Sequence, residues 1–131
     1  MTDHCPLCAK LAAGDTVLRS ARAAALADAF PVSDGHTLVV PVRHVADYFD
    51  LTPEERGEVV ALIQEVKDLL AARVRPDGYN IGINVGAAAG QTVPHAHVHV
   101  IPRYAGDTAD PRGGLRWVFP DRARYWSDRD E

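Results

Sequence analysis

The sequence is poor in cysteine, methionine and aromatic residues and has little net charge, and the shortage of cysteine and of charge each excludes a class of protein. Among 131 residues there are only two cysteines, one methionine and 7% aromatic residues, and the formal net charge is −4. The two cysteines, Cys5 and Cys8, are too close in sequence for a disulfide to close a large loop, and a cytosolic compartment would keep them reduced. A small negative charge gives no broad electrostatic footprint for nucleic acid, so no nucleic-acid partner is expected.

Long apolar runs are also missing. No stretch of about 18 apolar residues is present, and no charged-then-apolar signal opens the chain, so we expect no membrane partner and a cytoplasmic location. Hydrophobic residues make up 47% and charged residues 24% of the chain, close to the globular average, which argues against a disordered or fibrous protein. The length fits a single domain over residues 1–131.

One long helix is predicted after Thr52. Thr52, Pro53 and Glu55 supply an N-cap, a proline at the first helical position and a glutamate three residues after the cap, which together form a capping box. Apolar residues then recur at steps of three and four as far as Leu70. We expect the helix to end near Arg73, before the Pro-Asp-Gly turn.

The remaining pattern favours short strands. A short helical turn is expected after Cys8, through Leu11, and the last ~30 residues read as an extended tail anchored by Trp117 and Trp126. Five strands beside one long helix indicate an α+β domain. The predicted strands are Thr16–Arg19, Ala23–Ala27, His36–Pro41, Tyr79–Asn84 and His97–Ile101.

Three of the six histidines, His95, His97 and His99, alternate within one five-residue window. On a strand, the side-chain period of two would put all three imidazoles on one face. A half-buried strand with an incidental polar face is one interpretation, and a metal site is another. Because strand residues four apart are ~13 Å apart, at most two of the three could share one zinc ion.

Phosphate chemistry is the third interpretation. Neutral imidazole is a nucleophile toward phosphorus, and a neighbouring imidazole can donate a hydrogen bond to a phosphoryl oxygen or protonate a leaving group. Mutual repulsion between the rings keeps them from all being protonated together.

The segment from His95 to Ile101 resembles the His-x-His-x-His-x-x signature of the histidine-triad (HIT) family. The preceding Gly90-Gln91-Thr92-Val93 is similar to the stretch that leads into that signature, and residues 34–44 and 80–86 resemble two further strands of the family. The resemblance covers residues ~5 to 104. It implies a five-stranded antiparallel sheet with one long helix, a core over residues 5–104 and an extended tail over residues 105–131.

The resemblance also implies nucleotidyl hydrolysis or transfer through a covalent nucleotidyl-histidine. His97 would be the nucleophile, and His99 would contact the phosphate and help protonate the leaving group. Gln91, Thr92 and Asn84 would bind the phosphate side of the substrate, and Asp28 would bind ribose hydroxyls. Members are commonly homodimers, which makes the helix from Glu54 to Arg73 a candidate interface.

Residues 88–93 and 100–103 resemble the branch that acts on diadenosine polyphosphates, so an Ap4A-type hydrolase is the favoured function. A nucleoside phosphoramidase and a dinucleoside polyphosphate phosphorylase are the enzymatic alternatives. A nucleotide-binding sensor or adaptor without turnover is the alternative from another class, and a zinc enzyme with the metal on His97 and His99 is a further rival.

Cys5 and Cys8 are a weak signal alone, because a redox pair normally follows a strand and only four residues precede Cys5. Structural zinc needs two more ligands, and His44 and His95 can supply them. The family resemblance implies the same four ligands in zinc-containing bacterial members. Bystander cysteines are the alternative.

The other histidines and the tail have no firm role. His36 is expected to be a strand residue with a satisfied hydrogen bond, and His4 is expected to be solvated. A tail laid over the sheet by its tryptophans is the plain interpretation. A second hypothesis is that Arg112 or Arg116 neutralises the distal phosphates of a dinucleoside polyphosphate.

Overall fold

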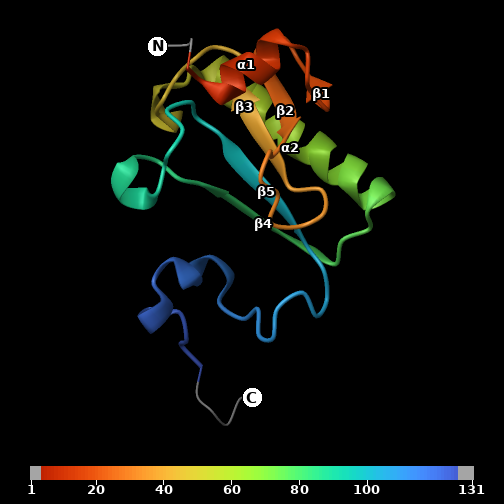
Figure 1. Ribbon diagram of the computed structural model, residues 1–131, viewed down its shortest axis with the longest axis vertical. Coiled ribbons are helices and arrows are strands. Elements are labelled where there is room, and N and C mark those ends of the chain that lie inside the picture. The colour runs from red at the N-terminus through yellow and green to blue at the C-terminus, as the bar shows by residue number, and fades with distance from the viewer. Residues whose placement is uncertain (1–3, 127–131) are drawn as a thin grey trace.

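The computed structural model describes residues 4–126. Its strands form one antiparallel sheet in the order β1-β2-β3-β5-β4, which confirms the α+β prediction (Figure 1). The strands are β1 Leu18–Arg19, β2 Ala23–Ala27, β3 Thr37–Pro41, β4 Gly78–Ile83 and β5 Val98–Arg103.

The long helix α2 spans Pro53–Arg73 and packs on one face of the sheet. Its N-terminus has the predicted capping box, since the Thr52 side chain accepts from the Glu55 amide and the Glu55 carboxylate accepts from the Thr52 amide. Val59, Leu62 and Val66 lie on its buried side at the spacing that the sequence predicts.

The other face of the sheet packs against the short helix α1, Pro6–Ala12. This helix begins before Cys8 rather than after it, because Cys5 is its N-cap and accepts a hydrogen bond from the Cys8 amide. Leu7 and Leu11 of α1 contact a cluster that includes Leu26 and Leu38. The sheet therefore has two apolar layers, one on each face.

Strand β5 starts one residue later than predicted and runs two residues further. His95 and His97 lie outside it, because Pro94 has no amide hydrogen and the Ala96 amide donates to the carbonyl of Val45, in the loop that precedes α2. Of the three alternating histidines only His99 lies on a strand. The predicted strand at Thr16–Arg19 is reduced to its last two residues.

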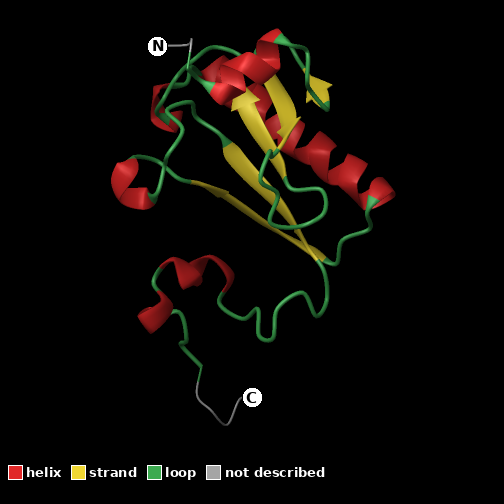
Figure 2. Ribbon diagram, in the orientation of Figure 1, coloured by secondary structure: helices red, strands yellow, loops and turns green. Residues whose placement is uncertain are grey.

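The tail leaves the sheet after β5 and is mostly irregular, with short 3-10 turns at Gly114–Val118 and Pro120–Arg122 (Figure 2). Trp117 anchors it locally by donating to the carbonyl of Arg112, and the Arg112 guanidinium lies over the ring of Trp126. The part of the predicted tail beyond residue 126 lies outside the described residues. Within residues 4–126, no helix has the length and apolarity needed to cross a membrane.

Candidate functional site

The candidate site lies on the sheet face opposite α2. Val98 and Val100 belong to the core cluster that contains the α2 side chains, so His99 between them points to the other face. His99 pairs with Leu38 of β3 and with Gly82 of β4. The rings of His97 and His99 are 5.0 Å apart, which brings the two predicted catalytic imidazoles together.

The hydrogen bonds of His97 determine which of its nitrogens can react. Its Nδ1 lies 2.8 Å from the backbone oxygen of His95, an acceptor, so the neutral ring has its proton on Nδ1 and its lone pair on Nε2. Nε2 has no hydrogen-bond partner among the described residues and is not fully buried, although His97 as a whole is only 9% exposed. This nitrogen is available to a substrate.

His99 is oriented by a histidine to which the sequence assigned no chemistry. The Val32 amide donates to His36 Nδ1 at 3.1 Å, so neutral His36 has its proton on Nε2. That nitrogen lies 3.0 Å from His99 Nδ1, which accepts the proton's hydrogen bond and leaves the proton of His99 on Nε2. His99 therefore presents an N–H group beside the open lone pair of His97.

Asp28 lies next to this pair. Its carboxylate is 3.3 Å from His36 Nε2 and also accepts from the backbone amide of Phe30. Burial lowers the pKa of His36, and the Asp28 charge offsets this only in part. Burial also lowers the pKa of His99, with further lowering from His97 and His36. The hydrogen bonds assigned to His36 and His99 require both rings to be neutral, and the lowered pKa values favour that form at pH 7.

The predicted phosphate-side residues lie in the loop that follows β4. Asn84 comes directly after β4, and the β4–β5 register extended by one pair puts it opposite His97. Asn84 and Thr92 are exposed, and within residues 4–126 neither side chain has a hydrogen-bond partner. Gln91 is engaged, since it accepts from the Gly86 amide and donates to the carbonyls of Ala46 and Val93.

The four predicted metal ligands meet at the other end of the histidine row. Cys5, Cys8, His44 and His95 each bring one ligand atom within 4.8 Å of the others. His95 Nε2 lies 2.9 Å from the carbonyl of Pro41, so Nε2 carries the proton and the lone pair of Nδ1 faces the thiols.

The dimensions of this cluster suit zinc. The sulfur–nitrogen distances are 3.3 Å for Cys8–His44, 3.4 Å for Cys5–His95 and 3.5 Å for Cys8–His95. Tetrahedral zinc with ordinary Zn–S and Zn–N bonds separates such atoms by about 3.5 Å. Burial and the neighbouring Cys5 raise the pKa of the Cys8 thiol, and a bound cation would reverse that effect.

The rival metal site on His97 and His99 gains no third protein ligand from the described residues. Among residues 4–126, two groups of three or more histidine, cysteine or carboxylate side chains bring ligand atoms within 4.8 Å of one another, and neither includes His97. The second group is Asp28, His36 and His99, in which His36 Nε2 and His99 Nδ1 already lie 3.0 Å apart in a hydrogen bond.

The tail arginines bind within the tail. The guanidinium of Arg112 pairs with Asp110, and that of Arg116 donates to the carbonyls of Arg122 and Ala123. Both arrangements favour a structural role for these arginines over neutralisation of distal phosphates. His4 is exposed, as expected.

Comparison with known proteins identifies the family of the chain. The HIT domain family model matches residues 11–106 of the chain. A Zn-bound histidine triad family protein from Mycobacterium smegmatis is similar in structure, with a TM-score of 0.75 and 33% identity over 84% of this chain and 82% of that one. The chain belongs to the HIT family.

Two curated relatives have names that state an activity. The chain is 39% identical over 95 residues to the AP-4-A phosphorylase of Mycobacterium tuberculosis, covering 72% of this chain and 49% of that protein. It is 39% identical over 92 residues to the asymmetrical bis(5'-nucleosyl)-tetraphosphatase of Schizosaccharomyces pombe, covering 70% and 50%. The chain spans about half the length of the curated relatives it matches.

Proposed function

We propose that the protein is an enzyme that cleaves nucleotides at the α-phosphate through a covalent nucleotidyl-His97 intermediate, with diadenosine polyphosphates as substrates. The observation that supports this most directly is the open Nε2 lone pair of His97 beside the N–H group of His99. The similarity to an AP-4-A phosphorylase and to a bis(5'-nucleosyl)-tetraphosphatase supports the substrate class.

In the first step His97 Nε2 attacks the α-phosphorus, the N–P bond forms and the P–O bond to the leaving nucleotide breaks. The Nδ1 proton stays on His97, and the His95 carbonyl stabilises the resulting positive ring. His99 Nε2–H donates a hydrogen bond to the oxygen that gains charge. Asn84 and Thr92 bind phosphate oxygens, and Asp28 accepts from the ribose hydroxyls.

Gln91 has a less direct place in this scheme. Its amide holds the loop after β4 through three hydrogen bonds, so it shapes the phosphate side of the site, and direct contact with phosphate requires exchange of one of those bonds. In the second step water attacks the phosphorus, a P–O bond forms and the N–P bond breaks. His97 Nε2 regains its lone pair, the proton of water passes to solvent, and a nucleoside monophosphate is released. Orthophosphate in the place of water would make the enzyme a phosphorylase and release a nucleoside diphosphate.

The test is intact-protein mass spectrometry after rapid alkaline quenching, with diadenosine tetraphosphate or adenosine 5'-phosphoramidate as the substrate, each with and without orthophosphate. Wild type should trap one adenylyl group, and the His97→Asn variant should trap none and lose kcat on the order of 10⁴-fold. His4→Ala, at an exposed histidine outside the site, is the matched control. An adenylyl adduct or wild-type kcat in His97→Asn would contradict the proposal, and nucleotide binding without turnover by wild type would favour a sensor.

Zinc on Cys5, Cys8, His44 and His95 is the second part of the proposal. Bound there it would be structural, tying the N-terminal segment to the sheet, because all four ligands come from the protein and none is left for water. The Cys5→Ser/Cys8→Ser variant should lose the metal in elemental analysis and melt at a lower temperature. Zinc retained by that variant would assign the metal to other residues.

We also propose a homodimer. Strand β4 is an edge of the sheet, and its Ile81 and Ile83 are 42% and 36% exposed. Val60 of α2 is 60% exposed. An exposed apolar edge of this kind favours pairing with a second copy of the chain. Light scattering after size-exclusion chromatography measures the mass of the protein in solution and tests the dimer.

A further inference from the structure

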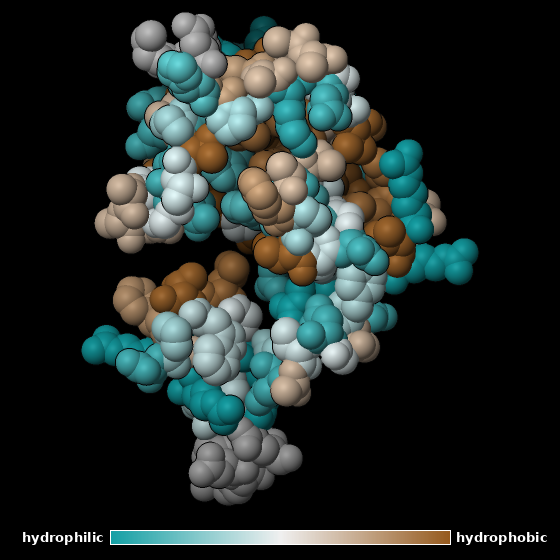
Figure 3. All heavy atoms as spheres, viewed as in Figure 1, coloured by the Kyte–Doolittle hydropathy of each residue, from teal (hydrophilic) through white to brown (hydrophobic). Residues whose placement is uncertain are grey.

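A large cavity lies between the tail and the sheet, beyond His99. Its volume is about 860 Å³, within the range of small-molecule binding sites. Three segments contribute its walls: the loop before β3, strands β4 and β5, and the tail. Among the lining residues are Val32, Asp34, Asn80, Ile101, Ala109 and Trp117. Figure 3 shows a notch between the tail and the body of the molecule, with hydrophobic side chains along it.

The cavity continues the histidine row. Ile101 is two residues after His99 on the same face of β5, about 6.6 Å further along the strand. Gly82, which pairs with His99, has no side chain, and Leu115 of the tail lies 3.7 Å from the position where a Cβ would stand. The tail therefore covers the sheet directly beside His99, on the side away from the Cys–His cluster.

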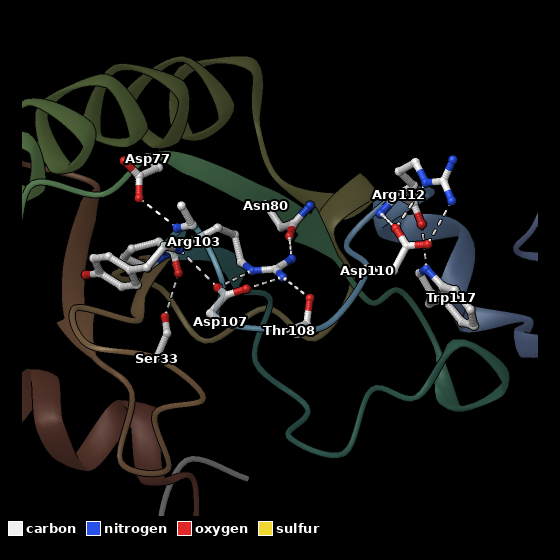
Figure 4. A network of polar contacts seen from close by, with 12 residues as sticks. Ser33, Asp77, Asn80, Arg103, Asp107, Thr108, Asp110, Arg112 and Trp117 are labelled. Atoms are coloured by element: carbon white, nitrogen blue, oxygen red, sulfur yellow. Dashed lines mark hydrogen bonds and ion pairs between the residues drawn. The ribbon is translucent and has the colours of Figure 1, made fainter. Parts of the chain in front are cut away.

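The cations around this cavity are paired. Arg103 donates twice to Asp107 and once each to Asn80 and Thr108 (Figure 4). Arg112 is held by Asp110 in the same view. Arg124, the other arginine that lines the cavity, lies over the ring of Trp126, and its charge helps to lower the pKa of Asp110. Both lining arginines thus already have an anionic or aromatic partner, which makes the walls less suited to a polyphosphate chain.

What the cavity does offer suits a nucleoside. Its lining is mostly apolar, and Trp117 supplies an aromatic wall on which a base can stack. The carboxylate of Asp34 lies at the cavity and has no hydrogen-bond donor among the described residues. A carboxylate with free acceptor positions can bind ribose hydroxyls.

We propose that this cavity binds the nucleoside of the leaving half of a dinucleoside polyphosphate. The inference rests on the proposed function. When His97 attacks the α-phosphorus and His99 faces the leaving oxygen, the departing phosphates pass His99 toward Ile101, and the second base reaches Trp117. The tail is then a substrate-selecting element that favours substrates with two nucleosides over those with one.

The experiment compares two substrates that share the His97 step. Diadenosine tetraphosphate has a second nucleoside, and adenosine 5'-phosphoramidate, whose leaving group is ammonia, has none. Ala109→Trp adds an indole at an exposed position that lines the cavity. It should lower the ratio of kcat/KM for the tetraphosphate to kcat/KM for the phosphoramidate by about 10-fold or more. Val118→Trp adds the same group to the same tail outside the cavity, and it should leave the ratio unchanged.

A second variant keeps the test independent of crowding. Trp117→Ala removes one wall and should lower the same ratio by about 10-fold. Ratios that stay at the wild-type value in both cavity variants would overturn the inference while the nucleotidyl-histidine chemistry stands. Wild-type turnover of the phosphoramidate without the tetraphosphate would overturn it as well. Failure of wild type to turn over either substrate would instead refute the proposed function.

Discussion

Each imidazole near the site has one nitrogen held by a neighbour, and the neighbour decides what the other nitrogen can do. Backbone carbonyls accept from His97 and His95, which leaves one lone pair toward the substrate side and another toward the thiols. A backbone amide donates to His36, which reverses the order and makes His99 a donor. Similar rings thus take different roles because of the groups beside them.

His36 should act as a positioning residue for His99. His36→Leu removes the donor to His99 Nδ1, so His99 can take the other tautomer, and we expect kcat to fall by roughly 10²-fold with little change in KM. His36→Gln places an amide N–H near the lost donor and should recover roughly 10-fold of that loss. Steady-state kinetics with the proposed substrates measures both variants.

The free energy of unfolding is the control for the two His36 variants. Urea unfolding of the two variants separates a folding defect from a catalytic one. Equal kcat in His36→Leu and His36→Gln, following their stabilities, would reduce His36 to a structural residue.

Among the secondary-structure elements, α2 was the most predictable. Its capping box and apolar spacing are local, so the sequence contained its start, its end and its buried side. The start of β5 was mispredicted because the Ala96 amide finds its acceptor at Val45, far away in the chain. The role of His36 was missed for the same reason, since its partner His99 is 63 residues away and gives no local signal.

The turn before β3 depends on Gly35, and Gly35→Ala should destabilise the protein by about 3 kcal/mol. Gly35 has a φ of +90°, and an added Cβ would lie 2.8 Å from Leu70 Cδ2 and 3.3 Å from Pro102 Cγ. Strain and crowding therefore add, and the shift should also move His36. Urea unfolding measures the loss.

Gly14→Ala is the matched control for this turn. Gly14 has a φ of +72° but nothing lies within 4 Å of the added Cβ, so only the backbone strain of about 1 kcal/mol is expected. Equal losses in the two variants would show that crowding at Gly35 is relieved without cost.

For the whole molecule, helix α1 and the described part of the tail lie at opposite ends of one histidine row. Helix α1 and its N-cap bring Cys8 and Cys5 to His95, and the tail forms one wall of the cavity beyond His99. The row of His95, His97 and His99 could be predicted from the sequence, because these residues belong to one contiguous family signature. The cavity could not be predicted, because its walls come from three segments whose packing leaves no periodic pattern.

Buried neutral histidines should make the folded state sensitive to mild acid. Burial lowers the pKa of His36 and His99 below the ordinary 6.5. Well above pH 6.5 these rings are neutral in both the folded and the unfolded state, and their contribution to stability is complete. As the pH falls below 6.5 the unfolded chain binds protons first, so stability is lost as the pH falls toward the folded pKa values, with a slope of up to about 1.4 kcal/mol per pH unit for each ring. The free energy of unfolding, measured with urea between pH 8 and pH 5, should therefore show a plateau and then a decline.

The decline of wild type also includes any effect of metal loss. The slope of the free energy of unfolding against pH in His36→Gln is therefore subtracted from the wild-type slope, and a positive difference is expected. Glu55, whose pKa is lowered to about 2, adds a second decline that begins only below its ordinary 4.5. A free energy of unfolding that stays level down to pH 5, or an identical slope in His36→Gln, would contradict a neutral buried His36.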